Sequence, residues 1–124
     1  MIQKNKNHRE IGSKYEHIAG AYLERQGYRI LEYNFHCRRG EIDLIAQDGE
    51  YLVFCEVKYR KGRTSGGPVD AVDVYKQRKL WKTAEYYLFV NGLHDVPCRF
   101  DVIGIEENRI ILIKNAFQEN CLYS

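Results

Sequence analysis

The sequence predicts an α/β domain with a mixed central β-sheet flanked by helices, in the order α-β-β-β-α-β-β. Two segments have apolar residues at helical spacing, and five shorter segments are rich in branched and aromatic residues. No repeat or interdomain linker interrupts the 124 residues. Strands joined by hairpins and flanked by helices are typical of such a sheet. A chain of this length can bury a core without disulfide bonds.

Two amphipathic segments predict the helices. Residues 1–10 are polar and basic and predict a flexible N-terminal arm, followed by a single domain of residues 11–124. The first helix is expected to end at Gly27, and its apolar stripe contains Ile11, Tyr15, Ile18, Ala19, Tyr22 and Leu23. The second helix is expected to begin at Val69 or Asp70 and to run to Val90, where Asn91-Gly92 ends it.

The five predicted strands are Tyr28–Phe35, Glu41–Gln47, Tyr51–Tyr59, Arg99–Glu106 and Arg109–Ile113. Asp48-Gly49, between the second and third strands, is typical of the loop of a type I′ hairpin, which needs positive φ at both positions. The segment Lys61–Pro68 is rich in glycine and predicts a flexible loop.

Composition limits the location and the class of protein. No stretch approaches the roughly 20 apolar residues that span a bilayer, and the N-terminus lacks the apolar core of a signal peptide. We therefore expect a cytoplasmic protein with no membrane association. Cys37, Cys55, Cys98 and Cys121 are not spaced as zinc-ligand pairs, so reduced thiols are expected.

The second and third strands carry a candidate metal site. If Asp48 and Gly49 form the loop, Asp43 lies opposite Phe54 and is the diagonal neighbour of Glu56 on one face of the sheet. Lys58, two residues after Glu56, shares that face. Two such carboxylates can hold Mg²⁺ or Mn²⁺, with the Val57 carbonyl as a further ligand. In a site that hydrolyses phosphodiester bonds, Lys58 would hold the attacking water or stabilise the negative charge at phosphorus.

Plainer interpretations of these residues remain open. Glu56 follows a nearly continuous apolar run, where a charge is costly unless it is paired, so Glu56 and Lys58 could simply form a structural ion pair. Glu16 lies beside the apolar stripe of the first helix between Gly12 and Gly20, and could be a third ligand or a surface acid. Gln77 lies on the buried stripe of the second helix, and its amide could bind lysine, phosphate or backbone.

A basic segment follows the acids. Net charge is only +2, but positive residues cluster between Lys58 and Lys82. They could bind phosphates or form an ordinary solvated surface. The candidate DNA-binding residues are Arg38, Arg39, Arg60, Lys61, Arg63, Lys76 and Lys79.

Four motifs in this order resemble those of the YraN family of bacterial proteins, in the PD-(D/E)XK nuclease superfamily. They are Gly40–Ala46, Leu52–Arg60, Lys76-Gln77 and Arg99–Val102, and the resemblance extends from about Ile11 to Ile113. The resemblance implies a restriction-endonuclease-like core similar to that of archaeal Holliday-junction resolvases. It also implies that Asp43, Glu56 and Lys58 are the central motif residues, joined by Glu16 and Gln77. No proline precedes Asp43, and Cys55 stands where the family more often has valine.

The sequence and the resemblance together lead to one hypothesis and two rivals. The hypothesis is a Mg²⁺- or Mn²⁺-dependent endonuclease that cuts branched or structured DNA, with catalytic residues Glu16, Asp43, Glu56, Lys58 and Gln77. The first rival is a DNA-binding module that retains the nuclease fold without turnover. The second is a nuclease directed at RNA. A homodimer would suit the two cuts that a two-fold symmetric junction needs.

Overall fold

The computed structural model describes residues 6–60 and 72–117, with side chains described from Lys14 onward. Its elements confirm the predicted order and the mixed sheet with two helices. They are α1 (Lys6–Arg25), β1 (Arg29–Cys37), β2 (Gly40–Asp48), β3 (Tyr51–Tyr59), α2 (Val74–Val90), β4 (Cys98–Ile105) and β5 (Ile110–Phe117).

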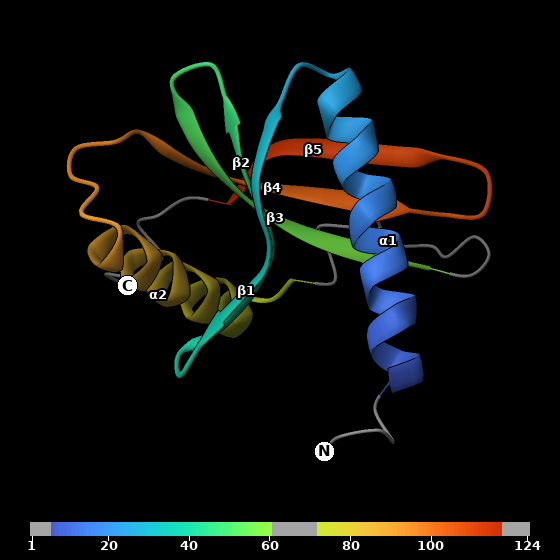
Figure 1. The fold of residues 1–124 in the computed structure, drawn as a ribbon, viewed down its shortest axis with the longest axis horizontal. Coiled ribbons are helices and arrows are strands. Elements are labelled where there is room, and N and C mark those ends of the chain that lie inside the picture. The colour runs from blue at the N-terminus through green and yellow to red at the C-terminus, as the bar shows by residue number, and fades with distance from the viewer. Residues whose placement is uncertain (1–5, 61–71, 118–124) are drawn as a thin grey trace.

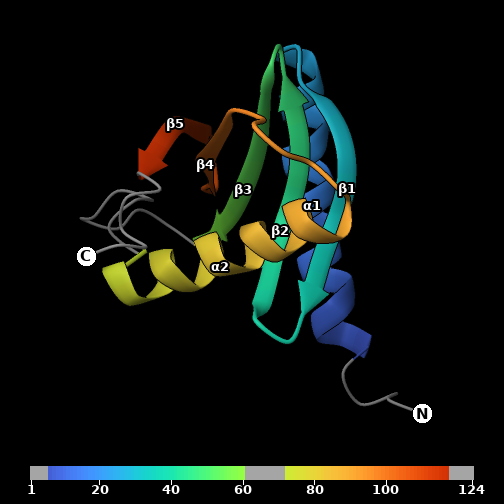
Figure 2. The same cartoon turned by 90° about the vertical axis from the view of Figure 1, so that its left-hand side faces the viewer.

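The five strands lie in the order β1-β2-β3-β4-β5, and each pair is antiparallel except β3 and β4, which are parallel. A parallel pair needs a crossover connection, and α2 lies in it. Figures 1 and 2 show that α2 covers one face of the sheet and α1 the other. The fold therefore has three layers, with the sheet in the middle.

Each face of the sheet has its own hydrophobic core. On the α2 side, Leu80, Trp81 and Ala84 pack against Phe54 and Phe100. On the α1 side, a second cluster contains Ala19, Leu23, Leu44, Val53, Cys55 and Ile103. The central strands are thus buried on both faces, as the continuous apolar run before Glu56 predicts.

The helix boundaries differ from the predicted ones. α1 begins at Lys6 rather than Ile11, so residues 6–10 of the predicted arm are helical. α2 begins at Val74, because the Asp73 side chain caps it by accepting a hydrogen bond from the Lys76 backbone N–H at 2.8 Å. The predicted loop Lys61–Pro68 and residues 1–5 lie outside the described residues.

The loop between β2 and β3 corrects the predicted register. Asp48 pairs with Tyr51, so the loop residues are Gly49 and Glu50. Within the described chain, Gly49 has positive φ (62°) and Glu50 does not. A type II′ turn needs positive φ only at its first central position, and glycine suits it, so this turn replaces the predicted type I′ turn. The pairing shifts by two positions in total, which preserves the face that Asp43 shares with Glu56.

Among the described residues, Cys37, Cys55 and Cys98 are not in disulfide bonds; Cys121 lies outside them. No helix in this part of the chain is long and apolar enough to cross a membrane.

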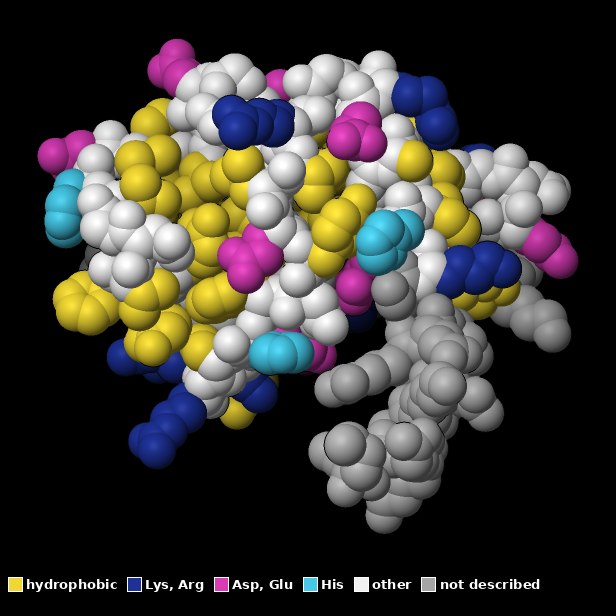
Figure 3. All heavy atoms as spheres, in the orientation of Figure 1, with side chains coloured by type: hydrophobic (Ala, Val, Ile, Leu, Met, Phe, Trp, Pro, Cys, Tyr) yellow, Lys and Arg dark blue, Asp and Glu magenta, His cyan; other side chains and the backbone are white. Residues whose placement is uncertain are grey.

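On the face drawn in Figure 3, hydrophobic side chains gather over the left half. Lysine and arginine side chains gather at the lower left of that face and lie singly elsewhere on it.

Candidate functional site

The site lies where β2 and β3 separate. Their pairing runs from Asp48 and Tyr51 to Leu44 and Cys55, and the same register continued by one step places Asp43 opposite Glu56. The sequence had predicted Asp43 opposite Phe54, and the changed turn accounts for the difference. The Asp43 carboxylate accepts a hydrogen bond from the Val57 backbone N–H at 2.8 Å. A side chain thus satisfies a donor that lies at the end of the β2–β3 ladder.

At this same point, the residues of the β1–β2 hairpin change the face of the sheet on which they lie. Tyr33 and Leu44 pair and lie on the α1 side, whereas Phe35 and Ile42 pair and lie on the α2 side. Strict alternation would keep residues two apart on one face. Asn34, between the two pairs, has a φ of 57° and breaks that alternation. The reversal lets Ile42 join the core under α2 while Asp43 remains beside Glu56.

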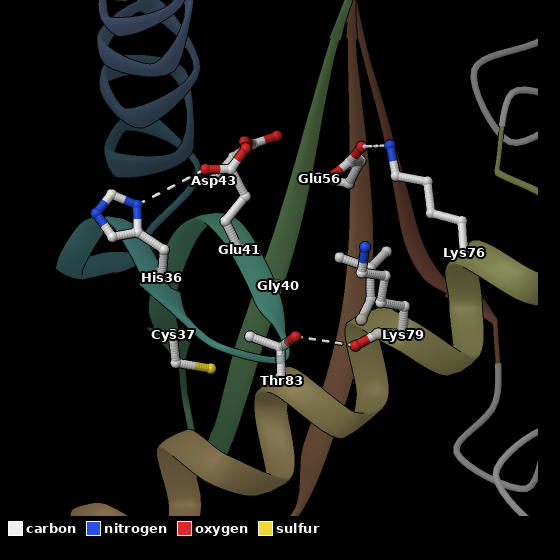
Figure 4. Close-up of a pocket in the computed structure, with 10 residues that line it drawn as sticks. His36, Cys37, Gly40, Glu41, Asp43, Glu56, Lys76, Lys79 and Thr83 are labelled. Atoms are coloured by element: carbon white, nitrogen blue, oxygen red, sulfur yellow. Dashed lines mark hydrogen bonds and ion pairs between the residues drawn. The ribbon is translucent and has the colours of Figure 1, made fainter. Parts of the chain in front are cut away.

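Two lysines neutralise Glu56, whose side chain is almost completely buried. Lys76 Nζ, from α2, lies 2.6 Å from Glu56 Oε2, and Lys58 Nζ lies 3.4 Å from the same oxygen. Figure 4 shows the Lys76 side chain reaching from the helix to Glu56 on the sheet. Lys76 is one of the predicted DNA-binding residues, and no feature of the sequence indicates that it pairs with a buried acid.

Burial and mutual repulsion perturb the charges of the site. Burial, and then the charge of Glu56, raise the pKa of Asp43 to about 8, although the Val57 N–H opposes the shift. Burial and the neighbouring Lys76 lower the pKa of Lys58. Burial lowers the pKa of Lys76 too, but the hydrogen bond and charge of Glu56 outweigh it, so the net shift is upward. Burial and the charge of Glu56 therefore oppose ionisation of Asp43 at neutral pH.

The two helical candidates, Glu16 and Gln77, have different surroundings. Glu16, on α1, is half-buried, and burial followed by the charge of Glu41 raises its pKa. Its own charge contributes to the raised pKa of Asp43, so it lies within electrostatic reach. Within the described residues, however, no three His, Cys, Asp or Glu side chains are grouped to hold a metal ion. Gln77 donates its amide N–H to the Val72 carbonyl at 3.0 Å, which is the backbone-bonded alternative left open above.

The acids open into a pocket of about 460 Å³ between the β1–β2 hairpin and α2 (Figure 4). Its helical wall is formed by Lys76, Lys79, Leu80 and Thr83, and its hairpin wall includes His36, Cys37, Gly40 and Glu41. Gly40, with φ of 150°, allows the hairpin to approach α2 closely, because a Cβ there would meet Thr83 Oγ1 at 2.9 Å. The sequence analysis did not single out the residues of the hairpin wall as lining a site.

The other predicted DNA-binding residues are dispersed. Arg38 and Arg39 are exposed in the β1–β2 turn, and Arg60 is half-buried after β3. Lys79 lines the pocket. Lys61 and Arg63 lie outside the described residues.

The motif Arg99–Val102 forms a buried network of hydrogen bonds and ion pairs and does not line the pocket. Asp101 is fully buried and accepts hydrogen bonds from Tyr28 Oη at 2.7 Å and from both Arg99 Nε and Nη2 at 2.9 Å. The Asn115 backbone N–H donates to it as well, at 2.9 Å. Arg99 also pairs with Asp48 at 2.8 Å, which ties β4 to the end of β2. A charged residue within an apolar strand was the only sequence signal for this network.

Comparison with known proteins identifies the family. A family model described as "Uncharacterised protein family UPF0102" matches residues 15–105, which include the site. A UPF0102 protein of Lachnoclostridium phytofermentans is 49% identical over 112 residues, covering 90% of this chain and 95% of that protein. A UPF0102 protein of Colwellia psychrerythraea is 43% identical over 120 residues, covering 92% and 93%. One from Symbiobacterium thermophilum is 48% identical over 114 residues, covering 88% and 97%. The chain therefore belongs to the UPF0102 family, the YraN family that its motifs resemble.

Proposed function

We propose that this protein is a Mg²⁺- or Mn²⁺-dependent endonuclease that hydrolyses phosphodiester bonds in branched or structured DNA. One observation carries the proposal: the carboxylates of Asp43, which is half-buried, and of Glu56, which is buried, adjoin each other where two strands separate, at the wall of a pocket. Lys58 lies beside them with its ammonium 3.4 Å from Glu56. Two adjacent acids that are largely removed from water are costly unless they are paired or used.

The donor set fits a divalent ion. Mg²⁺ is usually held by one or two carboxylates and keeps several waters, so Asp43 and Glu56 suffice, with the Val57 carbonyl as a further oxygen and Glu16 adding negative charge. Burial and then the charge of Glu56 raise the pKa of Asp43, and a bound cation would favour its ionised form. When bound, the ion supplies a Lewis acid for the phosphoryl oxygens and lowers the pKa of water.

The residues of the chain would divide the remaining work. Lys58 lies close enough to stabilise negative charge that develops at phosphorus, and its lowered pKa suits it to give up or share a proton with water. Gln77 holds the segment before α2 through the Val72 carbonyl, so we assign it a positioning role for the start of the helix that carries Lys76. Lys79, lower on the same helix wall, is placed to contact a phosphate of the bound strand.

The pocket favours a strand with an unpaired nucleotide. Its volume of about 460 Å³ is in the range of small-molecule sites, on the order of 300–1,000 Å³, and is too small for a duplex. Phosphodiester hydrolysis acts on the backbone, so the pocket has to admit only one strand at the cut. Branch points and junctions present strands in that form. The proposal includes a cytoplasmic location and, for a two-fold symmetric junction, two copies of the chain.

The direct test is cleavage of a substrate panel. Purified protein is incubated with Mg²⁺ or Mn²⁺ and with junction, flap, single-stranded and duplex DNAs, and with matched RNAs. Wild-type protein should cut junction or flap DNA, and Asp43→Asn, which keeps the shape of the side chain, should not. No cutting above the Asp43→Asn background on any substrate would refute the nuclease proposal; preferential cutting of the RNAs would reassign the substrate.

One observation favours a second candidate, a DNA-binding module without turnover. The Lys76 ammonium already satisfies Glu56, so the acid has a structural partner without any metal. This candidate predicts salt-dependent DNA binding that is unchanged in Glu56→Gln, together with no metal-dependent cutting.

A further inference from the structure

Two ammonium groups share one carboxylate oxygen at the centre of the site. Lys76 Nζ and Lys58 Nζ lie 2.6 and 3.4 Å from Glu56 Oε2. They come from different elements, since Lys58 is on β3 beside Glu56 and Lys76 crosses from α2 (Figure 4). The shorter contact is the one made across the pocket.

A divalent ion bound at Glu56 would compete with the two ammonium groups for that carboxylate. Mg²⁺ binds oxygen at about 2.0–2.1 Å, and a cation held there would repel an ammonium in hydrogen-bond contact with the same carboxylate. The repulsion is strongest for the closer ammonium, that of Lys76, so we expect Lys76 to withdraw. Lys76 is the one free to do so, because its flexible stem enters from a separate element and its side chain is 39% exposed, compared with 23% for Lys58.

We infer that Lys76 is a resident counter-ion of Glu56, which a divalent cation displaces when it binds between Asp43 and Glu56. The inference rests on the proposed metal site. It gives Lys76 two positions. In the metal-free protein Lys76 neutralises a buried acid pair, and in the loaded protein its ammonium turns into the pocket, where the phosphate of a bound strand would lie. Lys76 therefore weakens metal binding in the free protein and becomes available to DNA only after loading.

Lys79 provides a matched control. It lies one turn further along α2 and lines the same pocket. Among the described residues, the ammonium groups within ion-pair distance of Glu56 belong to Lys58 and Lys76, so Lys79 contributes positive charge to the pocket without occupying the carboxylate. Removing either Lys76 or Lys79 changes the net charge equally, but only the removal of Lys76 takes an ammonium group away from Glu56 Oε2.

The test measures Mn²⁺ binding to the full chain without DNA. Free Mn²⁺ is titrated by electron paramagnetic resonance in wild type, Lys76→Met, Lys76→Arg and Lys79→Met. Lys76→Met should bind Mn²⁺ at least about tenfold more tightly than Lys79→Met, because a competing positive charge within a few ångströms is removed. Lys76→Arg, which keeps the charge, should bind like wild type.

Thermal unfolding gives a second readout that does not depend on catalysis. In EDTA, Lys76→Met should have a lower Tm than Lys79→Met, because Glu56 loses its closest partner, and saturating Mn²⁺ should raise its Tm more than that of wild type. If Mn²⁺ binds wild type and Lys76→Met equally, or binds the variant more weakly, the counter-ion role is wrong while the metal site stands. If neither wild type nor Lys76→Met binds Mn²⁺, the metal site and the counter-ion role both fall.

Discussion

Replacing Asp43 by asparagine should stabilise the metal-free protein at alkaline pH and remove a stability loss that wild type suffers between about pH 5 and pH 8. The folded pKa of Asp43 is raised above the unfolded value. Its favourable contribution is therefore complete below the unfolded pKa and is lost as the pH rises through the folded pKa. Over this interval the folded state holds one proton more than the unfolded state, so the free energy of unfolding falls with rising pH.

The size of the effect follows from the shift. A pKa moved from 3.8 to about 8 has an upper limit of about 6 kcal/mol at high pH, since each unit corresponds to about 1.4 kcal/mol. Between about pH 5 and pH 8 the limit is about 4 kcal/mol. Lys76 can follow the charge as it develops and offset part of the repulsion, so we expect about half of that limit. Asparagine keeps an oxygen that accepts from the Val57 N–H, so the hydrogen bond is preserved.

The assay is urea unfolding in EDTA, followed by the fluorescence of Trp81, the single tryptophan, which is buried beside Phe54 and Phe100. The quantity compared is the difference between Asp43→Asn and wild type at each pH, so other titrating groups cancel. The control is Asp48→Asn. The hydrogen bond from Arg99 lowers the pKa of Asp48, so Asp48→Asn should instead lose stability above the unfolded pKa. A difference between Asp43→Asn and wild type that stays constant from pH 5 to pH 8 would refute the reasoning.

Two further predictions concern the scaffold. Arg99→Ala should lower the free energy of unfolding by about 3–5 kcal/mol in urea titrations, because Asp101, fully buried, is left without its charge partner. Arg109→Ala removes an ion pair with Glu106 in which the arginine is exposed to solvent, so it should cost less, on the order of 1 kcal/mol. Equal losses would contradict the role of the buried network. Gly40→Ala should cost about 1–3 kcal/mol, because the added Cβ meets Thr83 Oγ1 at a strained φ of 150°. Thermal unfolding should show that Thr83→Ala in the same chain recovers part of this loss, and no recovery would place the strain elsewhere.

Period-two alternation was enough to place Asp43, Glu56 and Lys58 on one face, and the apolar run of β3 was enough to predict a strand with these bounds. The register of β2 and β3 depends on the type of the turn between them. The sequence Asp48-Gly49 allows glycine at either central position of that turn, so it does not decide between the two registers. Because the alternative turn shifts the pairing by an even number, the shared face survived the wrong register.

Other features had no readable signal. The position of a lysine near the start of a helix does not show whether its side chain points to solvent or across a pocket. From the sequence, Lys76 is therefore predicted only as a DNA-binding residue. Asn34 tolerates positive φ, but asparagine does so in many loops, and nothing marked it as the point where β1 reverses its faces. The Arg99–Val102 motif signalled charge in a strand without showing that Asp101 closes a structural network.

The point where β2 leaves β3 also separates two parts of β2 that are held by different partners. The pairs from Asp48 and Tyr51 to Leu44 and Cys55 position the acids from one side only. Residues on the other side, toward the tip of the hairpin, belong to the β1–β2 pair and lie against α2. Substitutions, insertions or deletions at Arg38 and Arg39 would therefore reshape what the pocket admits while the acids stay in register. The shape of the pocket entrance and the register of the acids are thus set by different strand pairs.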